Sequence, residues 1–429
     1  MNPHGVMYWF RRDLRLDDNP GLRRAVALAK AHQTWLLPIA LPPPQAVDTP
    51  WGAVPRGAHA LAWSLQAHDA LDAQLRSMGS LLWRCQDLPA LHALAKQCGV
   101  AHIVGETIAA PFEQAQWASV ASNPSWQAHG VHQSTLLAPE ALPFAPEAVP
   151  LVFTAFRQAV EAAGLRATQP CEAVTALPPL PPELPPSPVL GLPKPVVRDD
   201  RSSIAAERRC GELGAREHWQ RYLDRQLPLS YWDTRNHLNG PDFSSQLSLD
   251  LAWGTLSARR AVAMLDDFER DHGQTKSSYW LWFELMWRDH FRWLHQRFGR
   301  QLYRARGLAA QPRPVRASHK DWLRWCAGQT GQPLVDAGMR ELTATGFLSN
   351  RMRQIVASYW LHDMGGDWRA GAAWFEAQLM DEDVFSNQGN WLYIAGLGSD
   401  PRGGRRFDIA RQTAQHDRDG QYQRQWGTA

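Results

Sequence analysis

Polar side chains that could hold a flat, hydrogen-bonding cofactor gather between Thr345 and Trp391. Some stand at the start of an expected helix and the others follow in an expected loop: Asn350, Arg351, Arg353, Gln354, Asp381, Asp383 and Asn387. Two indoles, Trp368 and Trp391, bracket that loop. Amide, carboxylate and guanidinium groups can bond one edge of a buried ring, and the indoles could connect the ring to the surface. These residue types do not suit a metal site or a phosphate-transfer site.

A second group of candidate residues lies on the aromatic-rich helix expected over 277–299. Trp280, Glu284, Trp287 and Arg288 fall on neighbouring faces of it, at positions i, i+4, i+7 and i+8. A carboxyl group in such apolar surroundings would have a raised pKa and could donate a hydrogen bond. The simpler alternative is a core helix in which Glu284 pairs with Arg288 one turn later. Without further context, that alternative is favoured.

Three serines, Ser244, Ser245 and Ser248, precede another expected helix. Their hydroxyl groups and the free N–H groups of a helix start could hold phosphate oxygens. Ordinary N-capping by serine explains the same pattern. On these residues alone, N-capping is the better interpretation.

Metal sites and common catalytic motifs find no support in the sequence. "DEDVFSNQGNW" (381–391) has Asp at the first and third positions of a calcium loop, but Ser386 and Leu392 replace the required Gly and Glu. His129 and His132 have no partner cluster, so solvated surface histidines are the better interpretation. No P-loop, GxSxG or HExxH motif is present, nor a GxGxxG after a strand. We therefore expect no metal.

The elements that position these residues divide the chain into three parts. Residues 1–137 alternate strands expected at 5–10, 34–41, 80–85 and 101–107 with helices at 19–32, 57–78 and 88–98. Short apolar strands between helices predict a parallel sheet covered on both faces. Residues 138–200 predict a Pro-rich linker with one helix near 151–163, because "LPPLPPELPPSPVLGLPKP" (177–195) cannot be regular structure. Residues 201–429 predict an all-helical domain, with helices expected at 203–224, 255–272, 277–298, 319–328, 335–344, 348–363 and 368–379.

Composition restricts the class of protein. A net charge of +3 over 429 residues excludes a histone-like polyanion binder. The 21 Trp residues are an outlier that core packing explains for the most part. Five scattered Cys residues without a CxxC motif predict a reducing compartment without disulfides or zinc. Because no signal-peptide core and no apolar run of about 18 residues is present, we expect a cytoplasmic protein that does not span a membrane.

Taken together, these segments resemble the photolyase/cryptochrome flavoprotein family, and specifically its cryptochrome-DASH branch. The resemblance covers nearly the whole chain, and "TGFLSNRMRQ" (345–354) and "DEDVFSNQGNW" (381–391) are its most specific motifs. It also includes "YWFRRDLRLDDNPGL" (8–22), "LPFAPEAVPLVFTAFRQAVE" (142–161), "TRNHLNGPDFSS" (234–245), "AGLGSDPRGGRRFDIARQ" (395–412) and "GQYQRQW" (420–426).

The resemblance implies an α/β antenna-binding domain, then a helical domain that holds FAD in a folded, U-shaped form. The FAD-binding residues it implies are Tyr231, Ser244, Ser245, Gln246, Leu247, Ser248, Glu284, Arg288, Asn350, Arg353, Asp381, Asp383 and Asn387. Tyr231 and the serines match phosphate-holding positions, and the placement of Tyr231 needs a one-residue offset. Arg353 and Asp381 match an ion pair against the isoalloxazine ring. Asp383 matches the pyrimidine edge of the flavin, and Asn387 the side chain that faces N5.

The implied function is blue-light repair of cyclobutane pyrimidine dimers by electron transfer from excited reduced FAD. The catalytic positions are Glu284, Trp287, Asn350, Gln354 and Tyr393. Gln354 stands where many duplex-active photolyases carry Met, and Tyr393 where they carry a second flanking Trp. Both features imply weaker base flipping from duplex DNA. The partner is therefore expected to be UV-damaged DNA, single-stranded or looped, bound by a monomeric protein.

Two positions depart from the family pattern or match it loosely. Trp391 and Trp368 match the first two members of the family's three-tryptophan electron relay, but Val315 falls at the third. The relay could end early or divert through Trp322, Trp325 or Trp360. Glu106 resembles a contact to an antenna folate only loosely, and methenyltetrahydrofolate remains an optional second cofactor.

Two other functions stay open from the sequence. One is a blue-light photoreceptor or regulatory protein that binds DNA or RNA with little repair. The other is repair of six-four photoproducts, which is disfavoured because Asn350 stands where that subgroup places a catalytic histidine.

Overall fold

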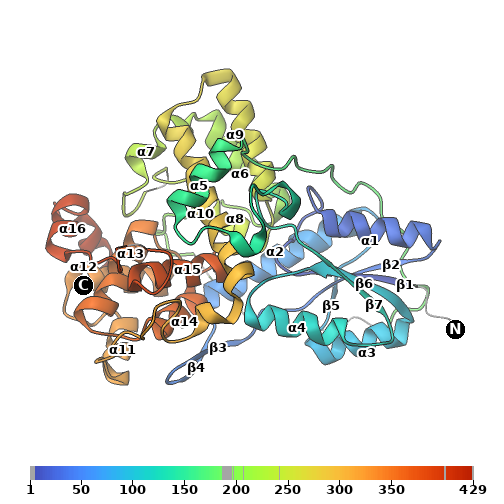
Figure 1. Cartoon of the computed structure of the whole chain (residues 1–429), viewed down its shortest axis with the longest axis horizontal. Helices are drawn as coiled ribbons and strands as arrows, with labels where there is room; N and C mark the ends of the chain where they lie inside the picture. Colours follow the sequence, from blue (N-terminus) through green and yellow to red (C-terminus); the bar gives the residue numbers. More distant parts are fainter. Residues whose placement is uncertain are drawn as a thin grey trace.

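The computed structural model describes residues 5–185, 196, 198–205, 207–240, 242–400 and 402–427. Within these residues the chain forms a half built around a sheet and a larger half built from helices (Figure 1). The described N-terminal strand lies in the sheet half, and the C-terminal helices lie at the far end of the helical half. This is the predicted fold class: an α/β domain with a parallel sheet, followed by a helical domain.

All five strands of the main sheet are parallel. In spatial order they are β5 (Trp83–Arg84), β2 (Leu36–Ala40), β1 (Gly5–Phe10), β6 (Val100–Glu106) and β7 (Gln127–Val131). Alternate side chains of the central strand β1 enter two separate cores, Val6 and Tyr8 on one face and Met7 and Trp9 on the other. The faces are covered by α1 (Pro20–Ala31), α2 (Ala58–Ser77), α3 (Leu88–Cys98) and α4 (Pro111–Ala121). Burial on both faces explains why β1 is apolar throughout.

The sequence predicted four of these strands and helices α1 to α3, but it missed three elements. The first is strand β7, which is polar and lies at the edge of the sheet. The second is helix α4, of which only Val120 is buried, so its sequence shows no apolar face. The third is an antiparallel hairpin of β3 (Ala46–Thr49) and β4 (Gly52–Pro55), whose sequence is too short and proline-rich to show a strand pattern. The hairpin extends beneath the helical half, where β3 packs against α14 (Trp368–Gln378) (Figure 1).

The segment between the halves packs against both of them. Its α-helix α5 (Phe153–Ala162) places Phe156 and Val160 in the core of the helical half. The chain then returns to the sheet half, where the Val174 N–H donates to the Leu16 carbonyl oxygen at 3.1 Å. Residues 186–195, the end of the Pro-rich stretch predicted to be a stiff linker, lie outside the described residues.

The rest of the chain is helical. Its helices are α6 (Gly211–Asp224), α7 (Tyr231–Thr234), α8 (Ser248–Trp253), α9 (Ala258–His272), α10 (Lys276–Phe298), α11 (His319–Cys326), α12 (Pro333–Thr345), α13 (Asn350–Ser358), α14, α15 (Val384–Ala395), α16 (Ile409–His416) and α17 (Gln421–Trp426). The sequence missed α7, α8, α15, α16 and α17. It also extended one helix across the π-helical turn Tyr359–Asp363, and it expected another to begin at 203, whereas α6 begins at Gly211. None of the described helices has the length and apolar character needed to cross a membrane.

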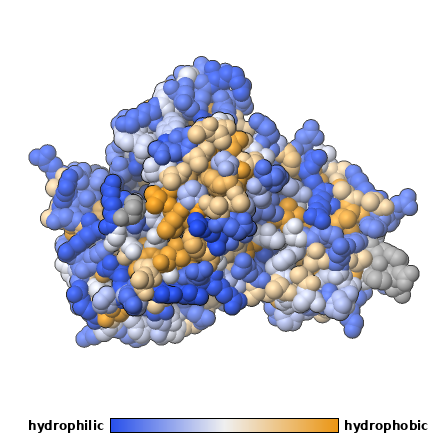
Figure 2. All heavy atoms as spheres, viewed as in Figure 1, coloured by the Kyte–Doolittle hydropathy of each residue, from blue (hydrophilic) through white to orange (hydrophobic). Residues whose placement is uncertain are grey.

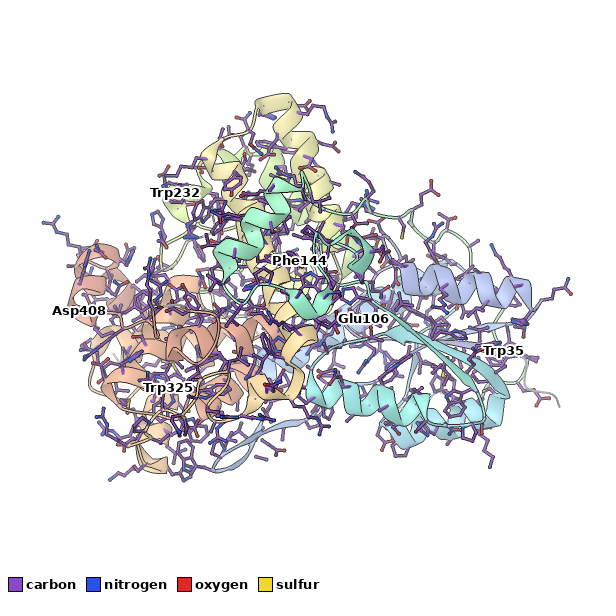
Figure 3. All side chains as sticks on the ribbon, viewed as in Figure 1. Trp35, Glu106, Phe144, Trp232, Trp325 and Asp408 are labelled. Carbon is purple, nitrogen blue, oxygen red and sulfur yellow. The ribbon has the colours of Figure 1, made fainter. Side chains whose placement is uncertain are left out.

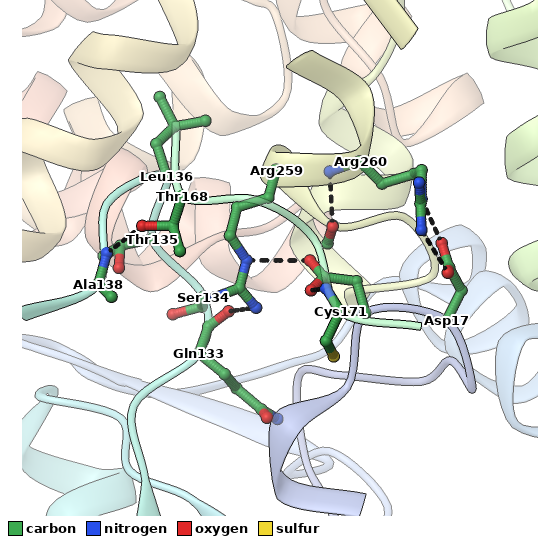
Figure 4. Close-up of polar contacts among 12 residues, drawn as sticks. Asp17, Gln133, Ser134, Thr135, Leu136, Ala138, Thr168, Cys171, Arg259 and Arg260 are labelled. Carbon is green, nitrogen blue, oxygen red and sulfur yellow. Dashed lines mark hydrogen bonds and ion pairs between the residues drawn. The ribbon is translucent and has the colours of Figure 1, made fainter. Parts of the chain in front are cut away.

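Buried ion pairs join the two halves, as Figure 4 shows. Two adjacent arginines of α9 reach the loop after β1: Arg259 pairs with Asp18 at 2.9 Å and Arg260 with Asp17 at 2.7 Å. The Asp17 backbone N–H also donates to the carboxylate of Glu212 on α6, at 3.0 Å. Because Asp18 is fully buried, these contacts fix the helical half against the carboxyl end of the central strand.

Candidate flavin and substrate site

Two connected cavities lie among the helices. The inner cavity has an empty volume of about 540 Å³ and is lined by residues of α13, α14, α15 and the turn before α15. The outer cavity is larger, about 1690 Å³, and is lined mainly from α8, α10, α13 and the segments around them. The two cavities share Asn350, Arg353, Gln354, Asp381, Asp383, Ser386 and Asn390. Five of them, Asn350, Arg353, Gln354, Asp381 and Asp383, belong to the polar cluster that the sequence showed.

The Arg353–Asp381 pair stands between the two cavities. Ser349 caps α13 by accepting the Met352 N–H, which starts the helix so that Arg353 lies in its first turn. Nη2 of Arg353 donates to both carboxylate oxygens of Asp381, at 2.9 and 2.8 Å. The Asp381 side chain is fully buried, whereas that of Arg353 is 24% exposed. The structure therefore contains the ion pair that the family resemblance implies.

Asp383 belongs to a second buried ion pair. Arg292 of α10 donates to it at 2.5 Å, and its carboxylate also caps α15 by accepting the Ser386 N–H at 2.8 Å. Burial alone would raise the pKa of Asp383, but the charges of Arg292 and Arg288 outweigh it and the pKa is strongly lowered. Asp383 is thus a permanent carboxylate that can accept hydrogen bonds at the edge of the cavities.

Asn387 is on a helix and not in a loop, which corrects the prediction for this stretch. The helix α15 begins at Val384, so Asn387 lies in its first turn. Its Nδ2 donates to the Ala372 carbonyl oxygen at 2.9 Å, and the side chain lines the inner cavity. Trp391 follows one turn later and lines the same cavity. Helical spacing therefore aligns the amide and the indole along one wall.

The serine segment lines the outer cavity together with the short helix α8. Ser244, Ser245, Gln246, Leu247 and Ser248 all face this cavity, and Tyr231 lies on its wall. The N-cap position of α8 is Leu247, without a side-chain hydrogen bond, so the serines do not cap the helix. Simple N-capping was the favoured sequence interpretation, and the geometry does not support it. Hydroxyl and N–H groups here remain available to a ligand.

Glu284 also lines the outer cavity and is not paired with Arg288. Arg235, from the turn after α7, donates to its carboxylate through a close ion pair, and Trp280 Nε1 donates to the same oxygen at 3.0 Å. About a third of the side chain (32%) remains exposed. Burial raises the pKa of Glu284, and the charge of Arg235 offsets this only in part. The i+4 pairing considered from the sequence is therefore wrong, while the raised pKa is confirmed.

Arg288 instead points toward the junction of the two halves. Its guanidinium donates to the carbonyl oxygens of Ser134 and Leu251, at 2.7 and 3.2 Å. Its Nε is buried, lacks a hydrogen-bond partner among the described residues and belongs to a side chain on the cavity wall. A buried donor without a partner, on a side chain of the cavity wall, fits a polar ligand in the cavity.

An aromatic group forms the outer part of the site. Trp287 is stacked on Phe153 with ring centroids 3.8 Å apart and is approached edge-on by Tyr393 at 5.5 Å. Gln354 lies on the wall of both cavities. Figure 2 shows hydrophobic side chains gathered in the middle of this face, over the region where α5, α10 and α15 meet, with hydrophilic margins around them. A flat base could therefore stack on one face of Trp287 only.

The residues singled out for the family's relay and antenna include three that lie outside the cavity walls described above. Trp368 is buried and donates its indole N–H to the Ala305 carbonyl oxygen at 3.0 Å. Val315 is exposed. Glu106 is buried at the junction of the two halves (Figure 3), and one of its carboxylate oxygens has no hydrogen-bond partner among the described residues. That oxygen could accept a hydrogen bond from an antenna, so the folate contact stays a prediction.

The family resemblance implied Arg353 as the partner of Asp381, but sequence reasoning missed the arginines that pair with Asp383 and Glu284. Arg292 follows Arg288 by one helical turn, so its position on α10 was a usable signal. Arg235 lies in "TRNHLNGPDFSS", far from Glu284 in sequence, and no local pattern connects the two. No cluster of three metal-binding side chains occurs among the described residues.

Comparison with known proteins agrees with this geometry. A family model for DNA photolyase matches residues 6–181, and one for the FAD binding domain of DNA photolyase matches residues 280–428. Cryptochrome DASH of Gloeobacter violaceus is 38% identical over 99% of this chain and 86% of its own length. The crystal structure of a Synechocystis cryptochrome superposes with a TM-score of 0.91 at 35% identity, covering 99% of this chain and 89% of the other. A class III photolyase from Agrobacterium tumefaciens superposes with a TM-score of 0.81 at 26% identity, covering 99% and 87%.

The chain therefore belongs to the photolyase/cryptochrome family of flavoproteins, and its helical half contains the family's FAD-binding domain. Within that family its relatives are cryptochromes of the DASH branch, from bacteria to Xenopus laevis.

Proposed function

We propose that this protein is a blue-light-dependent photolyase that repairs cyclobutane pyrimidine dimers in single-stranded or looped DNA. The observation that carries the proposal is the position of Glu284, which lines the same cavity as the serine segment and the Arg353–Asp381 pair. A hydrogen-bonding acid thus stands in one space with the groups suited to FAD. The protein would act as a cytoplasmic monomer.

When bound, reduced FAD supplies the electron that light transfers to the dimer. Glu284 would bond the carbonyl oxygen on which negative charge develops as the dimer accepts that electron. Because burial raises its pKa, Glu284 is protonated more easily than an exposed glutamate, and its protonated form can donate such a bond. Arg235 holds the carboxyl group in place and adds positive charge beside it. The electron returns after the ring splits, so no net redox change occurs.

The aromatic group would hold the damaged bases. Phe153 covers one face of Trp287, which leaves the other face for stacking by a base, in the space that Tyr393 borders. Each stacked base would contribute ~1–3 kcal/mol to binding. The hydroxyl group of Tyr393 is held by Arg405, so this ring is fixed in its position.

The preference for single strands is inferred from two side chains, and the charge around the cavity is suited to phosphate contacts with DNA in general. Gln354 and Tyr393 replace the Met and Trp implied for duplex-active relatives. This replacement would make flipping of the damaged bases out of a duplex less favourable. Arg235, Arg351 and Arg405 would contact phosphates, so affinity should fall steeply with salt concentration. An affinity for single strands that does not change with salt would contradict this part of the proposal.

The decisive experiment is blue-light repair by dithionite-reduced, FAD-loaded protein, with one thymine dimer placed in a single-stranded or a duplex oligonucleotide. Chemical reduction avoids any dependence on the relay. Repair of the single strand alone supports the whole proposal. Equal repair of both would show that Gln354 and Tyr393 do not limit flipping. Absence of repair in both, with FAD bound, would overturn it in favour of a photoreceptor or regulatory role.

A further inference from the structure

A chain of indole rings leaves the inner cavity in a direction that the family pattern does not use. It begins at Trp391, on the cavity wall, whose ring meets that of Trp325 edge-on with centroids 6.3 Å apart. Phe375 lies beside both rings, 5.2 Å from Trp391 and 6.3 Å from Trp325. Trp325 is fully buried inside the helical half (Figure 3).

The chain continues from Trp325 to the surface through two more indoles. Trp360 lies 5.4 Å from Trp325 and is also fully buried. Trp51, on the turn of the β3–β4 hairpin, lies 6.3 Å from Trp360 and is half-buried. Exposed His319 stacks on Trp51 at 5.7 Å and Trp322 packs against it at 5.4 Å. An uninterrupted series of ring contacts therefore connects the cavity wall to the solvent.

The buried rings are held in defined positions. The indole N–H of Trp325 donates to the Val356 carbonyl oxygen at 3.1 Å, and that of Trp360 to the Asp367 carbonyl oxygen at 2.8 Å. A Cβ added at Gly366 would lie only 2.0 Å from the ring of Trp360. Glycine is thus required where the backbone passes this indole.

Gly371 of α14 is required in the same way beside Trp391, the first ring of the chain. A Cβ there would lie 2.2 Å from Trp391. Trp360 itself belongs to the π-helical turn Tyr359–Asp363, an insertion of the kind often found at functional sites. Close packing and fixed N–H groups favour electron transfer because they leave little to reorganise.

The direction implied by the family has no aromatic ring at its third position. Trp368 stands second in the relay implied by the family, but the third position is Val315, an exposed aliphatic side chain. No ring at position 315 can therefore pass electrons on from Trp368.

We propose that Trp391, Trp325, Trp360 and Trp51 form an electron-transfer chain from the protein surface to the flavin cavity. The proposal rests on FAD binding in the cavity and not on DNA repair. Trp391 gives one electron to bound FAD that light has excited, and each further indole gives one electron to its neighbour on the cavity side, so the oxidised site moves outward to Trp51. A soluble thiol then gives one electron to Trp51 and its proton to water, and becomes a thiyl radical. No bond within the protein forms or breaks. The sheet half thereby supplies the surface contact for a path that ends in the helical half.

The test compares Trp51→Phe, Trp360→Phe and Trp368→Phe in the FAD-loaded protein under blue light with dithiothreitol. Loss of most flavin photoreduction is expected in Trp360→Phe, a partial loss in Trp51→Phe, and retention of most of it in Trp368→Phe. Trp117→Phe, a stacked indole in the sheet half, is the matched control and should behave like the unchanged protein. Full photoreduction in Trp360→Phe, with its loss in Trp368→Phe, would overturn the proposal.

A second readout separates electron transfer from structural damage. After a flash, pulsed electron paramagnetic resonance measures the distance between the unpaired electron on the flavin and the one on the oxidised indole. Trp51→Phe should shorten this distance, because the oxidised site is then confined to the inner rings. An unchanged distance would contradict the assignment of Trp51. Near-ultraviolet circular dichroism of the FAD-free variants should change only through the lost indole. Repair by dithionite-reduced Trp51→Phe and Trp360→Phe should equal that of the unchanged protein, whether or not repair itself is found.

Discussion

The carboxylates of the site differ in how deeply they are buried. We call Asp381, Asp383 and their arginines the inner wall, and Glu284 with Arg235 the outer wall. On the inner wall, Asp381 is fully buried against Arg353, and the Asp383 and Arg292 side chains are 11% and 5% exposed. On the outer wall, the Glu284 and Arg235 side chains are 32% and 21% exposed. A buried ion pair costs desolvation once, during folding, and then stays closed. A partly exposed pair can open for an incoming group. The inner wall is therefore suited to a resident cofactor and the outer wall to a substrate that comes and goes.

The strongest test of the inner wall is Asp383→Ala. Removing this carboxylate leaves the buried charges of Arg292 and Arg288 without their partner and removes the cap of α15. We expect a loss of about 3–5 kcal/mol in the free energy of unfolding together with loss of bound FAD. Urea titration and the flavin-to-protein absorbance ratio measure the two effects. Wild-type stability would show that the pair contributes nothing.

The corresponding change on the outer wall is Glu284→Ala. It should lower the repair rate of the reduced protein by ~10²–10³-fold, the usual effect of removing one donor to developing charge. FAD absorbance and unfolding should hardly change, because the side chain is already partly solvated. If FAD is lost along with activity, Glu284 belongs to the cofactor wall and the comparison fails.

Tyr393→Ala should have a smaller effect, limited to the substrate. Loss of one ring from the space beside Trp287 should weaken binding of dimer-containing single strands by ~1–3 kcal/mol. Fluorescence anisotropy at fixed salt measures the change, and Tyr393→Phe, which keeps the ring but not the contact to Arg405, is the control. Equal weakening in both variants would mean that the hydroxyl group, and not the ring, matters.

The smallest expected effect is a pH dependence. Because burial raises the pKa of Glu284, more of it is protonated at a given pH than for an exposed glutamate. Repair by reduced protein should decline as the pH rises through that pKa, by at most about tenfold per pH unit. Glu284→Gln, which cannot titrate, should abolish the decline. Persistence of the same profile in that variant would assign it to another group.

Most of the inner wall could be predicted from the sequence, because its residues lie in two compact motifs. Asn350 and Arg353 follow a serine cap, and Asp381, Asp383 and Asn387 lie within one short stretch, so local spacing brings them together. The placement of Asn387 in a loop was wrong because Asp383 caps a helix that begins directly after it.

The outer wall depends on long-range contacts that no local pattern records. Arg235 and Glu284 are 49 residues apart, and the partner of Glu284 was misjudged for that reason. The hairpin that contains Trp51 was likewise invisible, since two four-residue strands leave no periodicity to detect. Tertiary packing determines both features.

The ion pairs of Arg259 and Arg260 with Asp18 and Asp17 have a consequence for how the chain can be divided. Separating the halves would expose four charged groups that are now matched across one interface, along with the apolar surface around them. A single protease cut between α5 and α6 should therefore yield two fragments that still migrate as one particle in native gels. Each half expressed alone should aggregate, so the two halves form one folding unit despite their different architectures.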